Sequence, residues 1–191
     1  MKKILSLIAA VSVMCCLAAC SKTPDEAHTA EEDNTAVSAD ESPAESKVCE
    51  FANVVFDIPG GFVGQNDSET FKNYVTENYP QVPDSISLSR SAETLDDYSE
   101  DNLNMLMQQL NERAERNIYG DEGCIDYRQY TIDGHDAVSY KSEITADDTL
   151  SVQTQVVVFF DDGAVIISFS SISGEYDEEF AKSVDSIKIK G

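Results

Sequence analysis

Apolar and polar residues alternate in several short segments of the chain, and this alternation predicts β-strands. The first predicted strand covers residues 51–58, where Val54 and Phe56 share one side, and a Pro-Gly-Gly sequence ends it. A short strand is expected around residues 74–76. Serines occupy every other position of residues 85–89, which predicts an edge strand or a half-exposed one.

The second half of the chain carries longer alternating segments. Asp133-Gly134 and Asp162-Gly163 are typical of the tight turns that join hairpin strands. The run from Val156 to Phe160 is apolar on both sides, which favours a strand near the centre of a sheet that is covered on both faces. The strands predicted here are 124–132, 135–144, 151–160 and 163–172, followed by a short closing strand over 186–189.

Two segments have helical periodicity instead. Over residues 96–118 apolar side chains recur every three or four positions, acidic residues cluster at the start, and Gly120 is the expected stop. A shorter helix is predicted over residues 176–185. Strands joined mainly by hairpins, with two separated helices, predict an α+β fold. Its outline is an antiparallel β-sheet with helices packed on both faces, an α/β/α sandwich.

The chain before this domain changes character twice. Residues 21–47 contain no aromatic residue and are rich in Ala, Ser, Thr, Asp, Glu and Pro, so they are predicted to form a disordered acidic linker. Before them, Lys2 and Lys3 precede an apolar run from Ile4 to Leu17. This run is shorter than an ordinary membrane span and has the layout of a secretory signal.

The end of the apolar run, Leu17-Ala18-Ala19-Cys20, resembles the lipobox of bacterial lipoproteins. The resemblance implies cleavage before Cys20 and a diacylglycerol thioether on its sulfur, and two acyl chains are enough to hold a protein on a membrane. The expected organisation is a signal peptide over residues 1–19, a lipidated Cys20 with its linker over 20–47, and a globular domain over 48–191. The domain would lie on the extracytoplasmic side of the cell membrane; ordinary secretion remains the alternative.

The charge of the chain limits its partners. The full sequence carries a formal charge of −23, and the domain from Val48 onward has 28 acidic residues and nine Lys or Arg, so its own charge is near −19. Such a surface excludes nucleic acid as an expected partner and disfavours direct docking on anionic headgroups. Solubility explains the charge most simply, and cationic partners or divalent ions are the alternative.

The globular domain contains two cysteines, Cys49 and Cys124. An extracytoplasmic location permits a disulfide between them. Each flanks a predicted strand, and the sequence does not show whether the two approach each other. A Cys49–Cys124 disulfide and two reduced, partly buried thiols are both left open.

Several segments of the domain together resemble the PsbP/DcrB-like group of extracytoplasmic α/β proteins, which includes small bacterial lipoproteins. The segments are "FDIPGGF", "VTENYPQVPDSISLS", "YTIDGHDAVSYKSE", "VQTQVVVFFDDGAVIISFS" and "FAKSVDSIKI", and they cover about residues 50–190. The resemblance implies an accessory or assembly role and gives no catalytic motif or ligand set to transfer to this chain.

No pattern in the sequence predicts a catalytic, cofactor or metal site. His135 is the only histidine of the domain and directly follows a predicted turn, where a solvent-exposed side chain is expected. The chain contains neither a Gly-x-Ser-x-Gly elbow nor a phosphate-binding glycine loop. The acidic groups 147–148, 161–162 and 177–179 do not follow a calcium-binding loop pattern, so no dedicated cation site is predicted.

The function that these patterns favour is a noncatalytic lipoprotein that binds or scaffolds another component of the cell envelope. One predicted contact site is the loop with Tyr79, Pro80, Val82 and Pro83, although a rigid turn packed over the sheet explains the same residues. The other predicted contact site is a face of the sheet. Two alternatives remain: a small-ligand or cation-binding lipoprotein, and an unrecognised enzyme centred on His135.

Overall fold

The computed structural model describes residues 45–191. The predicted signal peptide, the lipid site Cys20 and the linker as far as residue 44 lie outside the described residues. The described chain begins just before a first strand at Lys47. Neither of the two α-helices in residues 45–191 is long and apolar enough to cross a bilayer.

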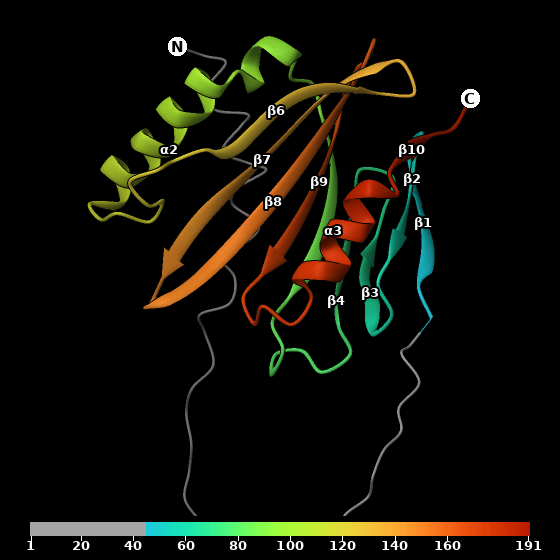
Figure 1. Cartoon of the computed structure of the whole chain (residues 1–191), viewed down its shortest axis with the longest axis horizontal. Helices are drawn as coiled ribbons and strands as arrows, with labels where there is room; N and C mark the ends of the chain where they lie inside the picture. Colours follow the sequence, from blue (N-terminus) through green and yellow to red (C-terminus); the bar gives the residue numbers. More distant parts are fainter. Residues whose placement is uncertain (1–44) are drawn as a thin grey trace, which may run out of the picture. The chain divides into compact units, whose positions relative to one another are not determined.

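A seven-stranded antiparallel sheet forms the centre of the domain (Figure 1). Its strand order is β3-β4-β5-β9-β8-β7-β6, and every neighbouring pair is antiparallel. The strands are β3 (Phe62–Asp67), β4 (Phe71–Thr76), β5 (Ser85–Ser91), β6 (Ile125–Ile132), β7 (His135–Ala146), β8 (Thr149–Phe160) and β9 (Gly163–Ser171).

The segment 51–58, predicted as one strand, is instead part of a hairpin. Strand β1 (Lys47–Phe51) turns at Ala52, whose φ is 51°, and returns as β2 (Val54–Ile58). The alternation of Val54 and Phe56 is kept within β2, whereas Phe51 belongs to β1. The two strands and β10 (Lys188–Ile189) form a separate small sheet in the order β1-β2-β10.

Two helices and a short 3₁₀ helix complete the described elements. The 3₁₀ helix η2 (Leu95–Tyr98) leads into α2 (Glu100–Ala114), whose N-cap is Ser99. Helix α2 ends earlier than predicted because Glu115, not Gly120, adopts the left-handed conformation that terminates it, with φ 52°. Helix α3 (Asp177–Asp185) agrees with the predicted range.

The helices cover opposite faces of the large sheet. On one side, called here the α3 face, Phe169 of β9 packs against Phe180 of α3 with ring centroids 5.4 Å apart. On the other side, the α2 face, Tyr98 of η2 packs against Phe159 of β8 at 5.7 Å. The small sheet shares the α3 face, as Figure 1 shows. The predicted α+β fold with helices on both faces is therefore confirmed.

The largest buried apolar cluster lies between the α3 face and the small sheet. Its side chains come from both sheets and α3, and all are less than a tenth exposed. Members include Phe56, Ile86, Val156, Ile167 and Phe180. The alternating residues of β2, β5, β8 and β9 thus supply a continuous core, as their sequence pattern predicted.

The structure places two strands differently from the sequence pattern. Strand β5 is an interior strand between β4 and β9 rather than an edge, but its serines are half-buried, so the half-exposed alternative agrees with the structure. On the α2 face Ser85 and Ser87 lie opposite Ser170 and Ser168, and Ser89 lies opposite Ile166. Strand β3 was not predicted because only its first residue, Phe62, is buried. An exposed strand leaves no apolar alternation to detect.

Candidate binding groove beside helix α3

Helix α3 is too short to cover its face of the sheet. It has nine residues and is therefore about 14 Å long, whereas β7 and β8 each have twelve residues and span about 40 Å. The part of the α3 face formed by β6, β7 and β8 is left partly uncovered. A groove follows the side of α3 over this region.

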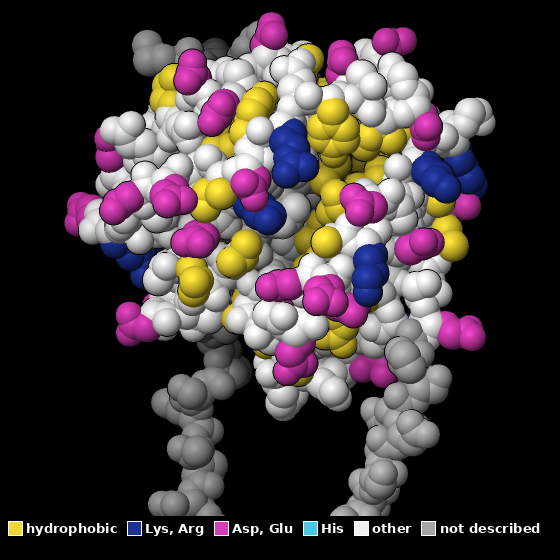
Figure 2. Space-filling model, viewed as in Figure 1, with side chains coloured by type: hydrophobic (Ala, Val, Ile, Leu, Met, Phe, Trp, Pro, Cys, Tyr) yellow, Lys and Arg dark blue, Asp and Glu magenta, His cyan; other side chains and the backbone are white. Residues whose placement is uncertain are grey.

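The inner part of the groove is a cavity of about 320 Å³. Its floor is formed by Val152 and Thr154 of β8 with Phe169 of β9, and its wall by Phe180 and Val184 of α3. Figure 2 shows hydrophobic side chains exposed between basic and acidic ones on the molecular face that carries α3. The cavity therefore has an apolar interior and a charged rim.

A second cavity of about 670 Å³ continues the groove towards strand β6. The two cavities share four lining residues, which makes them one feature: Arg128, Ser139, Val184 and Asp185. The second adds Tyr130 and Ile132 from β6 and Ile187 from the chain after α3. We call the two cavities together the α3 groove.

Two polar pairs lie at the rim of the groove, one of them an ion pair. Lys141 Nζ lies 3.2 Å from Asp126 Oδ2, and the Ser171 hydroxyl donates to Asp177 at the start of α3. Burial raises the pKa of the Tyr130 phenol, while the Ser139 hydroxyl and the Arg128 guanidinium act in the opposite direction. The groove therefore presents neutral phenol and hydroxyl groups together with the exposed Arg128 at neutral pH.

The predicted partner loop is tied down by its own hydrogen bonds. The backbone N–H of Tyr79 donates to Thr76 at 3.1 Å, that of Val82 donates to Asn78 at 3.2 Å, and the Thr76 hydroxyl donates to the Val82 carbonyl. Tyr79, Val82 and Pro83 are half-buried and Pro80 is exposed. These hydrogen bonds fit a rigid turn, which was the alternative interpretation of the loop. None of its four residues lines the α3 groove.

No sequence pattern marks Asp84, the residue that fixes this loop to the core. Its side chain is fully buried and accepts three hydrogen bonds: from the backbone N–H of Ile172 at 2.7 Å, the N–H of Ser173 at 2.9 Å and the Ser173 hydroxyl at 2.6 Å. These donors belong to the connection between β9 and α3. Asp84 therefore helps to position the helix that forms the wall of the groove.

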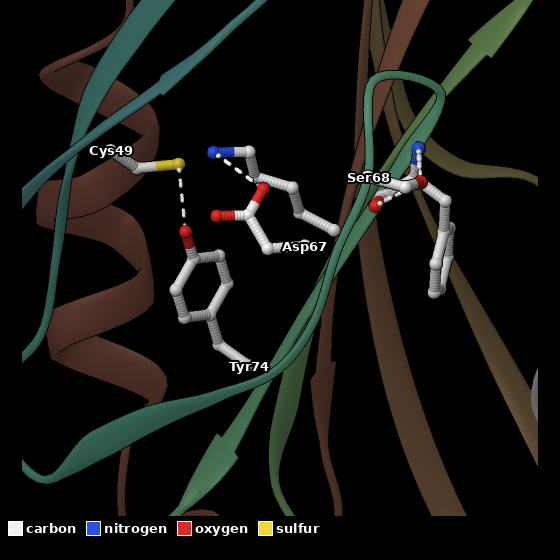
Figure 3. Close-up of polar contacts among 6 residues, drawn as sticks. Cys49, Asp67, Ser68 and Tyr74 are labelled. Carbon is white, nitrogen blue, oxygen red and sulfur yellow. Dashed lines mark hydrogen bonds and ion pairs between the residues drawn. The ribbon is translucent and has the colours of Figure 1, made fainter.

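The two cysteines of the domain are free and buried, so the disulfide alternative is not what the structure contains. Cys49 belongs to the core on the α3 side, whereas the backbone N–H of Cys124 is bound by Asn104 of α2 on the opposite side. The Cys49 thiol lies 3.5 Å from the Tyr74 hydroxyl, beside the Lys72–Asp67 ion pair (Figure 3). Burial raises the pKa of both thiols, for Cys124 to about 12.

His135 lies outside the groove. Its imidazole packs on the Phe160 ring at 4.9 Å, at the start of β7, and it lines neither cavity. The two pairs of aspartates at 147–148 and 161–162 form hairpin turns, and Asp177 lies in the first turn of α3. Within residues 45–191 no group of three or more His, Cys, Asp or Glu side chains is arranged to hold a metal ion.

A buried polar network on the α2 face was also missed. The Tyr140 hydroxyl donates to Gln155 Oε1 at 2.5 Å, and Gln155 donates in turn to Gln153 at 2.9 Å. Gln153 also bonds to Ser170 at 3.5 Å. Glutamines and serines at alternate positions of predicted strands were the available signal, because such polar rows need partners when the strand is interior.

Comparison with known proteins identifies the fold. No protein-family model and no curated protein matches the chain. Among solved structures, the domain is similar to cyanobacterial PsbP (CyanoP) from Synechocystis sp. PCC 6803, with a TM-score of 0.54 and 12% identity over 82% of this chain and 98% of that one. The domain therefore has a PsbP-like fold, in agreement with the resemblance seen in the sequence.

Two further structures are more distant. One is LpqN of Mycobacterium tuberculosis, described as involved in cell envelope biogenesis, with a TM-score of 0.46 and 14% identity over 80% of this chain and 88% of that one. The other is a Bacteroides thetaiotaomicron protein with a TM-score of 0.46 and 13% identity over 78% of this chain. The match spans half of the length of the Bacteroides protein.

Proposed function

We propose that this protein is a lipid-anchored, extracytoplasmic module of the cell envelope that binds a partner in the α3 groove and catalyses no reaction. The observation that carries the proposal is the groove itself. Its apolar floor, with Val152 and Phe169, is open beside a charged rim, which is the composition of a recognition surface. The Leu17–Cys20 sequence supports the anchor.

Fractionation of cells tests the anchor. Cys20→Ala removes the only sulfur that the lipobox pattern marks for lipidation, so we expect the protein to move from the membrane fraction to the soluble one. Cys16→Ala is the matched control, because it removes a cysteine from the apolar run and leaves Cys20 in place. Retention of the Cys20→Ala protein on the membrane would exclude this form of attachment.

Site-specific photocrosslinking in intact cells tests the binding role. Ser139 lines both cavities, so a photoreactive residue at position 139 would report on the α3 groove. Met105 of α2 is 49% exposed and lies on the opposite face, so position 105 is the control. We expect a discrete crosslinked protein from position 139, absent from position 105 and lost when Val184→Arg fills the groove. Equal labelling from both positions would argue against the groove.

A small amphiphilic ligand is the second candidate occupant. The inner cavity of about 320 Å³ lies within the usual size range of small-molecule sites, roughly 300–1,000 Å³. Native mass spectrometry of the protein purified from its own envelope distinguishes the two. If the protein carries a discrete added mass that is lost in Val184→Arg, and no crosslinked protein is found, the occupant of the groove is a small molecule and not a protein.

A further inference from the structure

Strand β6 is the longest open sheet edge in residues 45–191. It has eight residues, pairs with β7 on one side only, and ends the strand order of the large sheet. The other edges are shorter, and β3, like β6 between Ile125 and Arg128, has an irregular register. Strand β10 has two residues and β1 has five, while β3 has an irregular register between Gly64 and Asn66 and its Phe62 carbonyl accepts a bond from Lys47.

The β6–β7 turn defines which backbone groups of β6 face outwards. Asp133 and Gly134 form a two-residue turn with φ values of 49° and 85°, so the flanking Ile132 and His135 exchange both backbone hydrogen bonds. Along antiparallel strands, hydrogen-bonded pairs of this kind alternate with pairs whose backbone groups point away from each other. The N–H and C=O groups of Thr131 and Gln129 therefore point away from β7, and both residues are exposed.

The outer half of β6 is regular enough to accept another strand. Its only register shift lies between Ile125 and Arg128, which leaves residues 128–132 in continuous pairing with β7. Natural proteins usually protect an edge with a bulge, a proline or a charge, and β6 has an irregularity between Ile125 and Arg128, where Arg128 is also charged. Residues 129–132 contain no irregularity, proline or charged side chain, so this stretch of the edge is unprotected. An unprotected edge forms hydrogen bonds readily with an extended peptide.

The groove lies directly beside this edge. Arg128, Tyr130 and Ile132 line its outer cavity of about 670 Å³ together with Val184 and Ile187. A strand added to β6 would place every second side chain on this same face of the sheet. Apolar side chains at those positions would lie next to Tyr130, Ile132 and the end of α3.

Charge on the opposite face of the edge favours a basic segment. Asp136 pairs in register with Thr131 and is exposed, and Asp133 lies in the adjoining turn. The whole domain carries a charge near −19. A second copy of this chain would bring the same charge to the edge, so self-association is disfavoured and a cationic partner is attracted.

We propose that β6 takes up an extended segment of a partner protein as an additional strand of the large sheet. The segment has apolar side chains towards the α3 groove and basic side chains on the other face. This inference rests on the proposed function, because it states how the groove holds its partner. Backbone hydrogen bonds at Gln129 and Thr131 provide the pairing, and the outer cavity selects the apolar side chains.

The test uses the mature lipidated chain in detergent micelles and a capped seven-residue peptide of alternating lysine and valine. Hydrogen exchange followed by mass spectrometry reports protection of β6. We expect slower exchange over residues 127–132 when the peptide is added. A peptide of alternating glutamate and valine should bind at least about tenfold more weakly, because the acidic domain repels it.

Proline substitutions separate backbone pairing from side-chain contact. Gln129→Pro and Thr131→Pro each remove an outward N–H without removing a bond to β7, and each should weaken peptide binding about tenfold or more. Thr131→Ala is the matched control, because the Thr131 side chain lines neither cavity, and this variant should bind within about twofold of the natural protein. A peptide N-methylated at every residue keeps its side chains, loses its donors and should not bind, whatever the proline variants do to folding.

Three results would overturn the inference. These are unchanged exchange over 127–132 with the lysine–valine peptide, equal binding of the N-methylated peptide, and a β6-dependent dimer in sedimentation experiments. If the crosslink from position 139 persists in any of these cases, the proposed function stands and only strand addition fails. If that crosslink is absent as well, both proposals fail.

Discussion

Asp84 shows how a single side chain can position a whole helix. The residue follows Pro83 in a segment whose sequence predicts only a loop, yet its carboxylate is fully buried and accepts three hydrogen bonds from Ile172 and Ser173. A buried carboxylate is tolerated when its oxygens are satisfied in this way. The link holds the start of β5 against the connection that leads into α3.

Substitution of Asp84 should therefore destabilise the domain markedly. Asp84→Asn replaces one accepting oxygen by an NH₂ group that faces a donor, and we expect a loss of about 2 kcal/mol in the free energy of unfolding. Urea denaturation measures it. Asp161→Asn, in an exposed turn, is the control and should change stability by less than about 0.5 kcal/mol. Equal effects of the two substitutions would show that the buried hydrogen bonds contribute little.

The buried thiols of Cys49 and Cys124 make a second residue-scale prediction. Because burial raises both pKa values, the reactive thiolate is scarcer than in a free cysteine at every pH below the raised values. In a chain that starts at Ser21, neither thiol should react rapidly with a disulfide reagent at pH 8, and both should react in urea. If neither cysteine reacted with the reagent in urea without a reductant, Cys49 and Cys124 would be joined by a disulfide in the natural protein, and the prediction would be wrong.

At the scale of elements, tight turns decide how the strands pair. The sequence predicts the same kind of turn at Asp133-Gly134 and at Asp162-Gly163, but the two turns differ in the structure. Gly134 lies in its turn, whereas the second turn consists of Asp161 and Asp162, and Gly163 is the first residue of β9. Gly163 has φ 135° and lies against the backbone of the neighbouring strand β5.

Alanine substitutions at the two glycines should differ in their effect. A Cβ at Gly134 would meet nothing within 4 Å, so Gly134→Ala adds only backbone strain and should cost about 1 kcal/mol. A Cβ at Gly163 would lie 2.3 Å from the Ser91 carbonyl oxygen, so Gly163→Ala must also displace backbone and should cost about 3 kcal/mol or more. Thermal unfolding of the two variants provides the comparison, and equal costs would contradict the close approach of β5 and β9.

At the scale of the whole molecule, the charge of the domain works against its own stability. Near −19, the carboxylates repel one another, and this repulsion is strongest when little salt is present. Six ion pairs in residues 45–191 compensate only locally, and all involve exposed carboxylates. The same field favours a basic partner at β6.

Salt should therefore stabilise the folded domain. Raising NaCl from about 10 mM to about 150 mM shortens the screening length from about 30 Å to about 8 Å, and we expect the Tm to rise by roughly 2–4 °C. Calorimetry measures the shift. CaCl₂ at equal ionic strength should give a similar shift, and a much larger one would reveal a cation site that the acidic sequence left open. A Tm that falls with NaCl would contradict the repulsion.

The sequence by itself determined the elements whose signals are local. Apolar patterns and turn residues identified β6 to β9, and helical periodicity identified α2 and α3. Asp-Gly marked the β6–β7 turn. These signals are local because side-chain period and turn chemistry depend only on near neighbours. Recognition of short segments also gave the PsbP-like fold. The acidic charge and the lipobox pattern are likewise properties of the sequence.

Tertiary structure decided the rest, because it depends on what packs against what. The position of β5 inside the sheet, the placement of Cys49 and Cys124 on opposite sides, and the buried role of Asp84 all follow from strand order. The α3 groove arises because a helix of nine residues lies beside strands of twelve. No residue of the groove carries a local signature, since a surface between elements exists only after they meet.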